Sequence, residues 1–434
     1  MTSTIHSRAT KTKPGVLRLF SNSRYCLYFG GQLISQSGTW MQMVASSWLA
    51  YKLTGSAFLL ATVGMSSQLP SLITMPLAGV LVDRFNRHQI VLVTQIVAMM
   101  QAAVLATLAL THQIHLWHLL VLGVWSGIVN GFDMPSRSAF VFGLVENKSD
   151  LPAAIAMNST LMNITRLIGP ALAGFIVASF GEGMCFLVNA VSYLAVIVAL
   201  LFIRGQFAPP RVRTTSIKQE LFDGLHYVWQ LMPLRALILM LAIFGLGGMA
   251  YVLLLPVFVK EIGGDAHTLG YLMSASAVGS LLAALMLAQR KQVPGLGRWI
   301  TRASFGFAVG IILFSRVHNF WPAVLILAFL GFNMMIQLAA TNTILQALIH
   351  DDKRGRVMSL FAMAFLGTAP IGSLICGALS NHFGFNSTIL GCGIYCLIVA
   401  TIWAFYMPRL RLAVRPLYIE KGLLIAEQEV PKLT

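Results

Sequence analysis

Long apolar segments constrain this chain more than any other feature of its sequence. A helix that crosses a bilayer needs about 20 predominantly apolar residues. The chain contains about twelve such segments, near residues 25–51, 56–82, 88–110, 116–136, 157–180, 183–203, 235–259, 268–289, 299–317, 320–345, 357–380 and 385–406. Hydrophobic residues make up 57% of the 434 and charged residues only 10%, which is too apolar for a soluble domain. The segments lack the alternation of barrel strands, so we predict an all-α integral membrane protein.

Basic residues gather in every second connection between these segments. Lys and Arg number 30 against 14 Asp and Glu, which gives a net charge of +16. The remaining connections hold only Lys52, Lys260 and Arg316. This asymmetry is typical of the positive-inside rule, so we expect both termini in the cytoplasm. It does not indicate nucleic-acid binding, because the charge is not collected on one face of a domain.

A long polar stretch divides the segments into two sets of six. Residues 204–234 hold two adjacent prolines and several basic residues, followed by an amphipathic stretch. The expected organisation is an N-terminal tail (1–24), a six-helix bundle (25–203), a linker with an amphipathic helix (204–234), a second six-helix bundle (235–406) and a C-terminal tail (407–434). Gly174 and Gly377 are each followed by a Phe-Gly pair six residues later, which indicates a weak parallel repeat.

A charged hinge follows the second segment. It carries Gly79, Asp83, Arg84 and Arg87. Such dense charge must leave the hydrocarbon, where each ionised side chain costs about 2.5–3.5 kcal/mol. The spacing G-x-x-x-D-R-x-x-R resembles the loop between the second and third helices of major facilitator superfamily transporters, although Asn86 and His88 replace the Gly and the basic residue of that pattern. The resemblance implies two pseudo-symmetric halves of six helices each.

Further blocks resemble one branch of this superfamily, the enterobactin-exporter-like or transmembrane secretion effector group. They lie at residues 37–42, 53–56, 132–140, 158–159 with 166–174, and 354–360. The similarity runs from about residue 16 to residue 407. Because this branch exports siderophores, peptides and drugs on one scaffold, the resemblance implies a secondary active exporter but does not identify its solute.

The superfamily resemblance also implies a cytoplasmic latch, in which the hinge aspartate meets the start of the eleventh helix. The residues assigned to this latch are Gly79, Asp83, Arg84, Arg87, Asp133, Arg137, Arg166, Arg354 and Arg356. For the hinge itself, the alternative is an ordinary charged loop that sets topology. For Arg166, the alternatives are membership of the cytoplasmic ion-pair cluster and a snorkelled anchor.

Asp133 is a carboxylate that the sequence places within a helix near a membrane boundary. Asn130, Asp133 and Arg137 are three and four residues apart, so they share one stripe of the fourth helix. We interpret Asp133 as a strut, meaning a structural residue that holds helices together through an ion pair with an arginine. That arginine is either Arg137 or one of the hinge arginines. The alternative is a site that couples transport to protons.

Polar and aromatic residues on helix faces outline an expected substrate cavity. Its assigned residues are Gln32, Gln36, Trp40, Asn130, Phe244, Tyr251, Asn333, Gln337 and Thr341. Amides can instead join helices without touching a substrate. A second set is expected to let helices bend and approach closely, and comprises Gly169, Pro170, Gly174 and Pro370. Such a cavity suits an amphipathic or aromatic solute.

The sequence indicates no cofactor, no metal site and no enzymatic activity. His112, His115 and His118 do not settle on one helix face, and no phosphate-binding loop is present. We therefore expect a proton-coupled exporter of a siderophore-like metabolite or an amphipathic drug, monomeric, in a bacterial inner membrane. Its expected partners are a small molecule, protons and membrane lipids, and not nucleic acid. The alternatives are a lipid or lysolipid flippase and, less favoured, a receptor that transports nothing.

Overall fold

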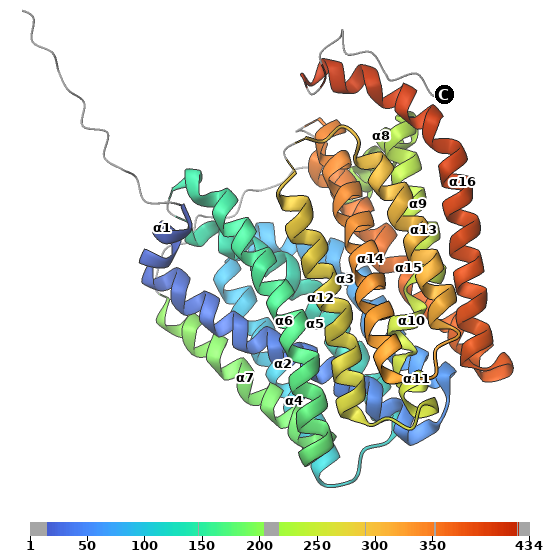
Figure 1. The fold of residues 1–434 in the computed structure, drawn as a ribbon. Coiled ribbons are helices and arrows are strands. Elements are labelled where there is room, and N and C mark those ends of the chain that lie inside the picture. Colours follow the sequence, from blue (N-terminus) through green and yellow to red (C-terminus); the bar gives the residue numbers. More distant parts are fainter. Residues whose placement is uncertain are drawn as a thin grey trace, which may run out of the picture.

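The computed structural model describes the chain from residue 15 to residue 424, with gaps at 146, 204–216, 291, 351–352 and 423. The side chains of residues 15–16, 76, 79–84, 148 and 217–221 also lie outside the description. Within the described residues all regular structure is helical, and Figure 1 shows the long helices packed side by side.

Helices cover each of the twelve apolar segments. In the first half they are α2 (Ser23–Thr54), α3 (Ala57–Arg84), α4 (Arg87–Leu110), α5 (Leu116–Leu144), α6 (Leu151–Phe180) and α7 (Glu182–Phe202). In the second half they are α9 (Met232–Gly248), α10 (Ala250–Leu253), α11 (Leu255–Glu261), α12 (Ala266–Ala288), α13 (Leu296–Phe314), α14 (Phe320–Leu348), α15 (Arg354–Phe383) and α16 (Phe385–Glu420). The shorter elements are α1 (Gly15–Ser21), η1 (Lys148–Asp150) and α8 (Ile217–Gln230).

The segment predicted near 235–259 is broken rather than continuous. Its three pieces, α9, α10 and α11, are separated at Met249 and Leu254. The first break follows Gly247 and Gly248, because glycine weakens a helix interior. The second precedes Pro256, which has no backbone N–H to donate and favours the first turn of a new helix.

Two other helices extend past their predicted ends. α5 continues through Pro135 to Leu144, past the predicted end near residue 136. α16 continues past residue 406 to Glu420, and Figure 1 shows its last part turning across the end of the bundle. Prolines are tolerated inside such helices because neighbouring groups satisfy the freed carbonyls.

Ten helical spans of the described chain are long and apolar enough to cross a membrane. The other two long helices, α2 and α5, carry the polar residues Gln32, Gln36, Asn130 and Asp133 in their middle and later turns. These side chains lower the apolar character of helices that otherwise have spanning length. The chain is thus a multi-pass, all-α membrane protein, and this fold class is confirmed.

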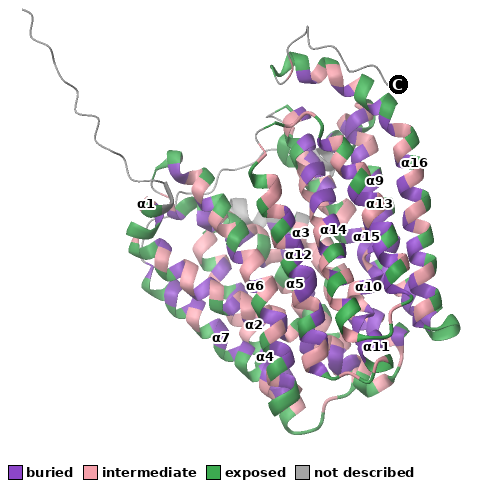
Figure 2. Cartoon of the chain, viewed as in Figure 1, coloured by how far each residue is buried: buried purple, intermediate pink, exposed green. Residues whose placement is uncertain are grey.

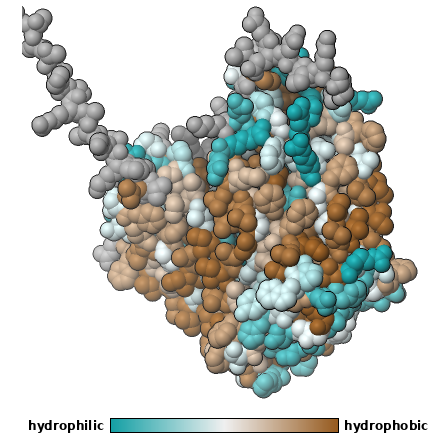
Figure 3. All heavy atoms as spheres, in the orientation of Figure 1, coloured by the Kyte–Doolittle hydropathy of each residue, from teal (hydrophilic) through white to brown (hydrophobic). Residues whose placement is uncertain are grey.

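The outer surface of the bundle is apolar around its middle. Figure 3 shows a broad hydrophobic region between more hydrophilic ends, and Figure 2 shows exposed residues along the outward faces of the helices. Phe405, Trp321 and Phe202 are exposed by 81%, 74% and 73%. Large side chains exposed to this extent indicate contact with lipid rather than water.

The helices form two sets that meet along two seams. α2 to α7 pack together, α9 to α16 pack together, and the sets join where α6 contacts α12 and where α3 contacts α15. Figure 1 shows the first set in blue to green and the second in yellow to red. In both seams the second long helix of one half meets the fifth of the other. This reciprocity is the pseudo-twofold arrangement of parallel repeats.

Polar contacts between the two sets gather toward one end of the bundle. We call this the far end, where α2 meets α3 and α15 meets α16, and call the end with the connection between α3 and α4 the hinge end. At the far end Asn381 Nδ2 donates to Ser56 Oγ at 2.8 Å, and Asn381 Oδ1 accepts from the backbone N–H of Ala57 at 2.9 Å. Lys260 Nζ lies 5.1 Å from the ring centroid of Trp48. These contacts hold the far ends of the halves together.

Glycines allow very close helix packing within the second half. A Cβ at Gly279 of α12 would overlap the carbonyl oxygen of Ala328 in α14, and would lie only 2.7 Å from its carbonyl carbon. Gly279→Ala is therefore expected to lower the free energy of unfolding by about 1–3 kcal/mol. Thermal unfolding in detergent would measure the change. Gly391→Ala is the matched control, since a Cβ there meets nothing within 4 Å. Equal melting temperatures for the two variants would contradict the close packing.

Candidate functional site

A buried ion pair lies on α5. Arg137 Nη1 is 3.7 Å from Asp133 Oδ2, and both residues are more than nine-tenths buried. Asp133 Oδ1 also accepts hydrogen bonds from Thr94 Oγ1 at 3.0 Å and Gln95 Nε2 at 2.7 Å, both on α4. Arg137 Nη1 donates to Gln32 Oε1 of α2 at 3.2 Å. The pair therefore joins three helices of the first half.

This geometry favours the strut interpretation of Asp133. Its partner is Arg137, one of the arginines that the sequence offered, and the four-residue spacing puts both on one helix face. Every partner described belongs to the first half, so neither residue bridges the halves in this structure. Thr94 and Gln95 were missed by the sequence reasoning. The sequence could have indicated them, because they are two adjacent polar residues between apolar residues of α4.

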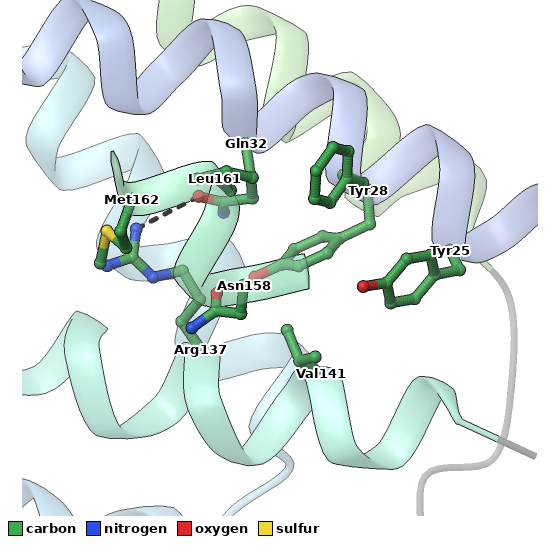
Figure 4. A pocket seen from close by; sticks show the side chains of 9 residues that line it. Tyr25, Tyr28, Gln32, Arg137, Val141, Asn158, Leu161 and Met162 are labelled. Carbon is green, nitrogen blue, oxygen red and sulfur yellow. Dashed lines mark hydrogen bonds between the residues drawn. The ribbon is translucent and has the colours of Figure 1, made fainter. Parts of the chain in front are cut away.

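A small pocket opens beside this ion pair between α2, α5 and α6. Figure 4 shows Tyr28, Gln32, Arg137 and Asn158 converging on it. The hydroxyl of Tyr28 and the amide nitrogen of Gln32 are buried and have no hydrogen-bond partner in the described chain. The pocket therefore combines a cation with unsatisfied polar groups near the hinge end of the first half.

Apart from Arg166, the other latch residues lie on three helices, α3, α4 and α15. Gly79, Asp83 and Arg84 fall in the last turns of α3, but their side chains lie outside the described part, as do Asp351 and Asp352. Arg87 is the first residue of α4 and Arg354 the first of α15.

Arg356 pairs with the linker helix. Its Nη1 lies 3.1 Å from Asp223 Oδ2 of α8, and a Cβ at the adjacent Gly224 would approach the Arg356 side chain at 3.0 Å. Asp223 was not among the predicted site residues. The described contacts thus tie α15 to α8, and do not include a bridge from Arg356 to the hinge.

Arg166 lies about midway along α6 rather than near either end. A residue adds about 1.5 Å along a helix, so each end of α6 is roughly 20 Å away. Among the described contacts it has no ion pair and no hydrogen bond to the Asp133 cluster. Instead it lies within electrostatic range of Tyr251 on α10, in the other half. Arg166 therefore faces the meeting of the halves.

A second pocket lies within the second half. It is lined by Phe244, Phe307, Phe365, Met334 and Gln337, together with neighbouring apolar residues and Gly248. The rings of Phe244 and Phe307 are 5.2 Å apart, and Tyr251 contacts Phe307 at 5.9 Å. The structure thus places Phe244 and Gln337 on one pocket, with Tyr251 next to its Phe307 wall.

The remaining cavity residues are more dispersed. Asn130 is exposed and donates to Ser126 on its own helix, whereas Asn333 Nδ2 donates to the carbonyl of Phe329. Trp40 packs against Gly169, and Gln36 is partly buried on the same helix. Thr341 is buried on α14. These residues share no single pocket in this conformation.

An amide network in the first half was not predicted. Gln42 Nε2 donates to Gln101 Oε1 at 2.9 Å, and Asn189 Nδ2 donates to Gln42 Oε1 at 2.7 Å. Gln101 Nε2 in turn donates to the carbonyl oxygen of Leu122 at 3.1 Å. The signal was the third glutamine of α2 and of α4, Gln42 and Gln101, and the one asparagine of the apolar α7, Asn189. Because these amides form hydrogen bonds with one another and with a backbone carbonyl, we infer that they join helices rather than contact a substrate.

The glycines and prolines assigned to bending serve close approach. A Cβ on Gly174 would lie 2.7 Å from the carbonyl oxygen of Ala266 and 3.2 Å from the Cα of Gly270. A Cβ on Gly169 would lie 2.5 Å from the Cβ of Trp40. The helices α6 and α15 both continue through their prolines, Pro170 and Pro370.

Known proteins resemble the chain over nearly its whole length. The multidrug efflux pump Tap of Mycolicibacterium fortuitum is 26% identical over 413 residues, covering 93% of this chain and 97% of that protein. The staphyloferrin A transporter of Staphylococcus aureus is 24% identical and covers 89% and 96%. A bacterial homologue of the human lysosomal transporter Spinster, solved in an inward-facing and unoccupied conformation, has a TM-score of 0.66 at 13% identity, with 94% and 99% covered. This last likeness concerns the fold.

The family assignment follows from a match that spans most of the sequence. The profile of the transmembrane secretion effector family matches residues 18–415, which include all twelve apolar segments. The two sets of helices and their reciprocal seams agree with the architecture that the sequence resemblance implied. The chain belongs to the transmembrane secretion effector family of the major facilitator superfamily of transporters.

Proposed function

We propose that the chain is a secondary active transporter that exports a small molecule from the cytoplasm by alternating access. The observation that carries this proposal is the pair of reciprocal seams, α6 with α12 and α3 with α15, between two matched halves. Rocking of such halves about a central site moves a solute across the membrane. Contacts gathered at the far end fit a state that is closed on that side.

The solute is proposed to be a siderophore-like metabolite or an amphipathic drug. One relative is named for multidrug efflux and another for a siderophore. The aromatic pocket around Phe244 and Gln337 suits a solute with apolar and hydrogen-bonding parts. The names of these relatives do not favour a lipid flippase or a receptor.

We place the hinge end in the cytoplasm, because the basic connections gather there. Both termini would then be cytoplasmic, and the membrane would be the bacterial inner membrane. In this proposal the chain works as a monomer surrounded by lipid, with protons as the coupling ion. It binds no nucleic acid and catalyses no chemical step.

Proton coupling predicts that the direction of the pH gradient changes the rate of efflux. Proteoliposomes that contain the purified protein should release a loaded amphipathic dye faster when the external medium is made acidic, because an antiporter exchanges outward solute for inward protons. A protonophore should remove this acceleration. Release that ignores both treatments would contradict proton coupling, and flip of a fluorescent lysolipid without dye release would favour the flippase.

A metabolite comparison tests the class of solute. Cells that lack the protein, grown under iron limitation, should retain an intracellular chelator if the solute is a siderophore. Unchanged chelator with greater sensitivity to dyes or antibiotics would instead identify drug efflux.

A further inference from the structure

Arg166 is an interior cation without a counter-charge in the described chain. It lies about midway along α6 and is surrounded by protein on nearly every side. Its side chain nevertheless keeps some accessible surface, so it borders internal space. A charge at this depth costs about 2.5–3.5 kcal/mol or more, and buried charges are normally paired. No described carboxylate pairs with Arg166.

Two buried hydroxyl groups from the other half lie in the same region. Tyr251 of α10 and Ser276 of α12 are buried, with 0% and 6% exposure, and Tyr251 lies within electrostatic range of Arg166. Two residues before Ser276, Ser274 Oγ donates to the carbonyl oxygen of Leu167, the neighbour of Arg166, at 2.9 Å, which brings α12 to this part of α6. The two hydroxyls interact with each other, and neither has a further hydrogen-bond partner in the described chain. In such a pair one O–H bonds to the other oxygen, so one O–H donor remains for a bound group.

An aromatic pocket lies beside these polar groups, and Phe307 is the residue that links the two. Tyr251 contacts Phe307, which forms one wall of the pocket that contains Gln337. The amide nitrogen of Gln337 is also buried and unpartnered, with 3% exposure. The region therefore presents a guanidinium, two hydroxyls and an amide N–H beside aromatic rings.

This combination selects for one kind of chemical group. A guanidinium can only donate hydrogen bonds, hydroxyls can donate them, and an amide N–H only donates. A planar oxyanion accepts several such bonds at once, and arginine binds it with two parallel bonds. A cationic or purely apolar solute would leave Arg166 uncompensated.

We propose that Arg166, with Tyr251, Ser276 and Gln337, forms a binding site for the carboxylate of an amphipathic solute whose aromatic or apolar part occupies the pocket beside Phe307. This inference rests on the proposed export function and names its substrate class. The arginine belongs to the first half and the other three residues to the second. A bound carboxylate would thus contact both halves at their meeting.

Equilibrium binding to the full chain in lipid nanodiscs tests the site. The probes are 2-naphthylacetate and its neutral amide, 2-naphthylacetamide, compared by isothermal titration calorimetry. We expect the carboxylate to bind roughly 10- to 100-fold more tightly, since hydrogen bonds to charged groups contribute about 1.5–3 kcal/mol. Arg166→Gln should remove this preference while amide binding stays unchanged, and Arg166→Lys should retain part of it. Arg316→Gln, which removes an exposed charge at the far end, should change neither affinity.

Several outcomes would overturn the proposal. Equal binding of both probes by the unaltered protein would do so, and so would an Arg166→Gln variant that keeps the preference. Equal weakening of both probes in Arg166→Lys would indicate a structural role. Because binding does not require transport, proton-driven dye efflux without carboxylate preference would overturn only this inference, whereas carboxylate preference without any efflux would overturn only the proposed function.

Discussion

Asp133→Asn is expected to abolish proton-driven efflux and to destabilise the protein strongly. The substitution keeps an acceptor for Thr94 and Gln95 but removes the negative charge that lies 3.7 Å from Arg137. Arg137 would then be a buried cation without compensation, and breaking such a pair costs about 3–5 kcal/mol. Thermal unfolding in detergent and dye efflux from proteoliposomes would measure the two losses.

A double variant separates the two roles considered for Asp133. In Asp133→Asn/Arg137→Gln both charges are absent, and replacing a complete buried pair by neutral groups is often close to neutral for stability. If Asp133 is a strut, the double variant should regain most of the stability and the efflux. If it carries the coupling proton, the double variant should fold but remain inactive in proton-driven efflux. We expect recovery, because Asp133 has an arginine and two hydrogen-bond donors as its partners.

The fold was predictable because membrane helices carry a strong local signal. Each must contain its own backbone hydrogen bonds and about 20 apolar residues, so length and hydropathy locate it without tertiary information. Boundaries were less predictable. α16 continues to Glu420 and α5 to Leu144, because a helix can extend beyond its apolar residues. The breaks around Met249 depend on glycine and proline, whose effects vary with their neighbours.

The site was only partly predictable. The ion pair between Asp133 and Arg137 follows from a four-residue spacing on one helix, which the sequence displays directly. Contacts between helices depend on rotation and tilt, which no single segment specifies. For this reason Gln95 was missed as a partner of Asp133, and Asp223 was missed as a partner of Arg356.

Gly174 is another residue whose contacts with a neighbouring helix could not be predicted from the sequence. Those contacts predict a second substitution with a large effect. The sequence suggested bending and close approach without naming the partner helix, and the structure shows α6 packed against α12 at Gly270. A Cβ on Gly270 would lie 2.5 Å from the carbonyl oxygen of Pro170 and 3.0 Å from the Cα of Gly174. This contact lies on the far-end side of the seam between the halves. Added volume there would push apart the ends that the described contacts hold together.

Gly270→Val is therefore expected to shift the conformational equilibrium away from the observed state and to stop transport. Overpacking costs about 1–3 kcal/mol, which changes a two-state ratio on the order of tenfold. Spin labels on cysteines at Gln113 and Ser387, exposed far-end positions on opposite halves, would report the change by pulsed electron resonance in nanodiscs. The distance between them should lengthen. The smaller Gly270→Ala should act in the same direction but less strongly.

The control for this experiment must add the same side chain without touching the seam. Gly391→Val does so, because a Cβ at that position of α16 meets nothing within 4 Å. It should leave both the label distance and transport unchanged. A folded Gly270→Val variant with an unchanged distance would mean that the halves do not separate along this contact. Alternating access would then have to use a different opening, and Gly174 and Gly270 would be only packing residues.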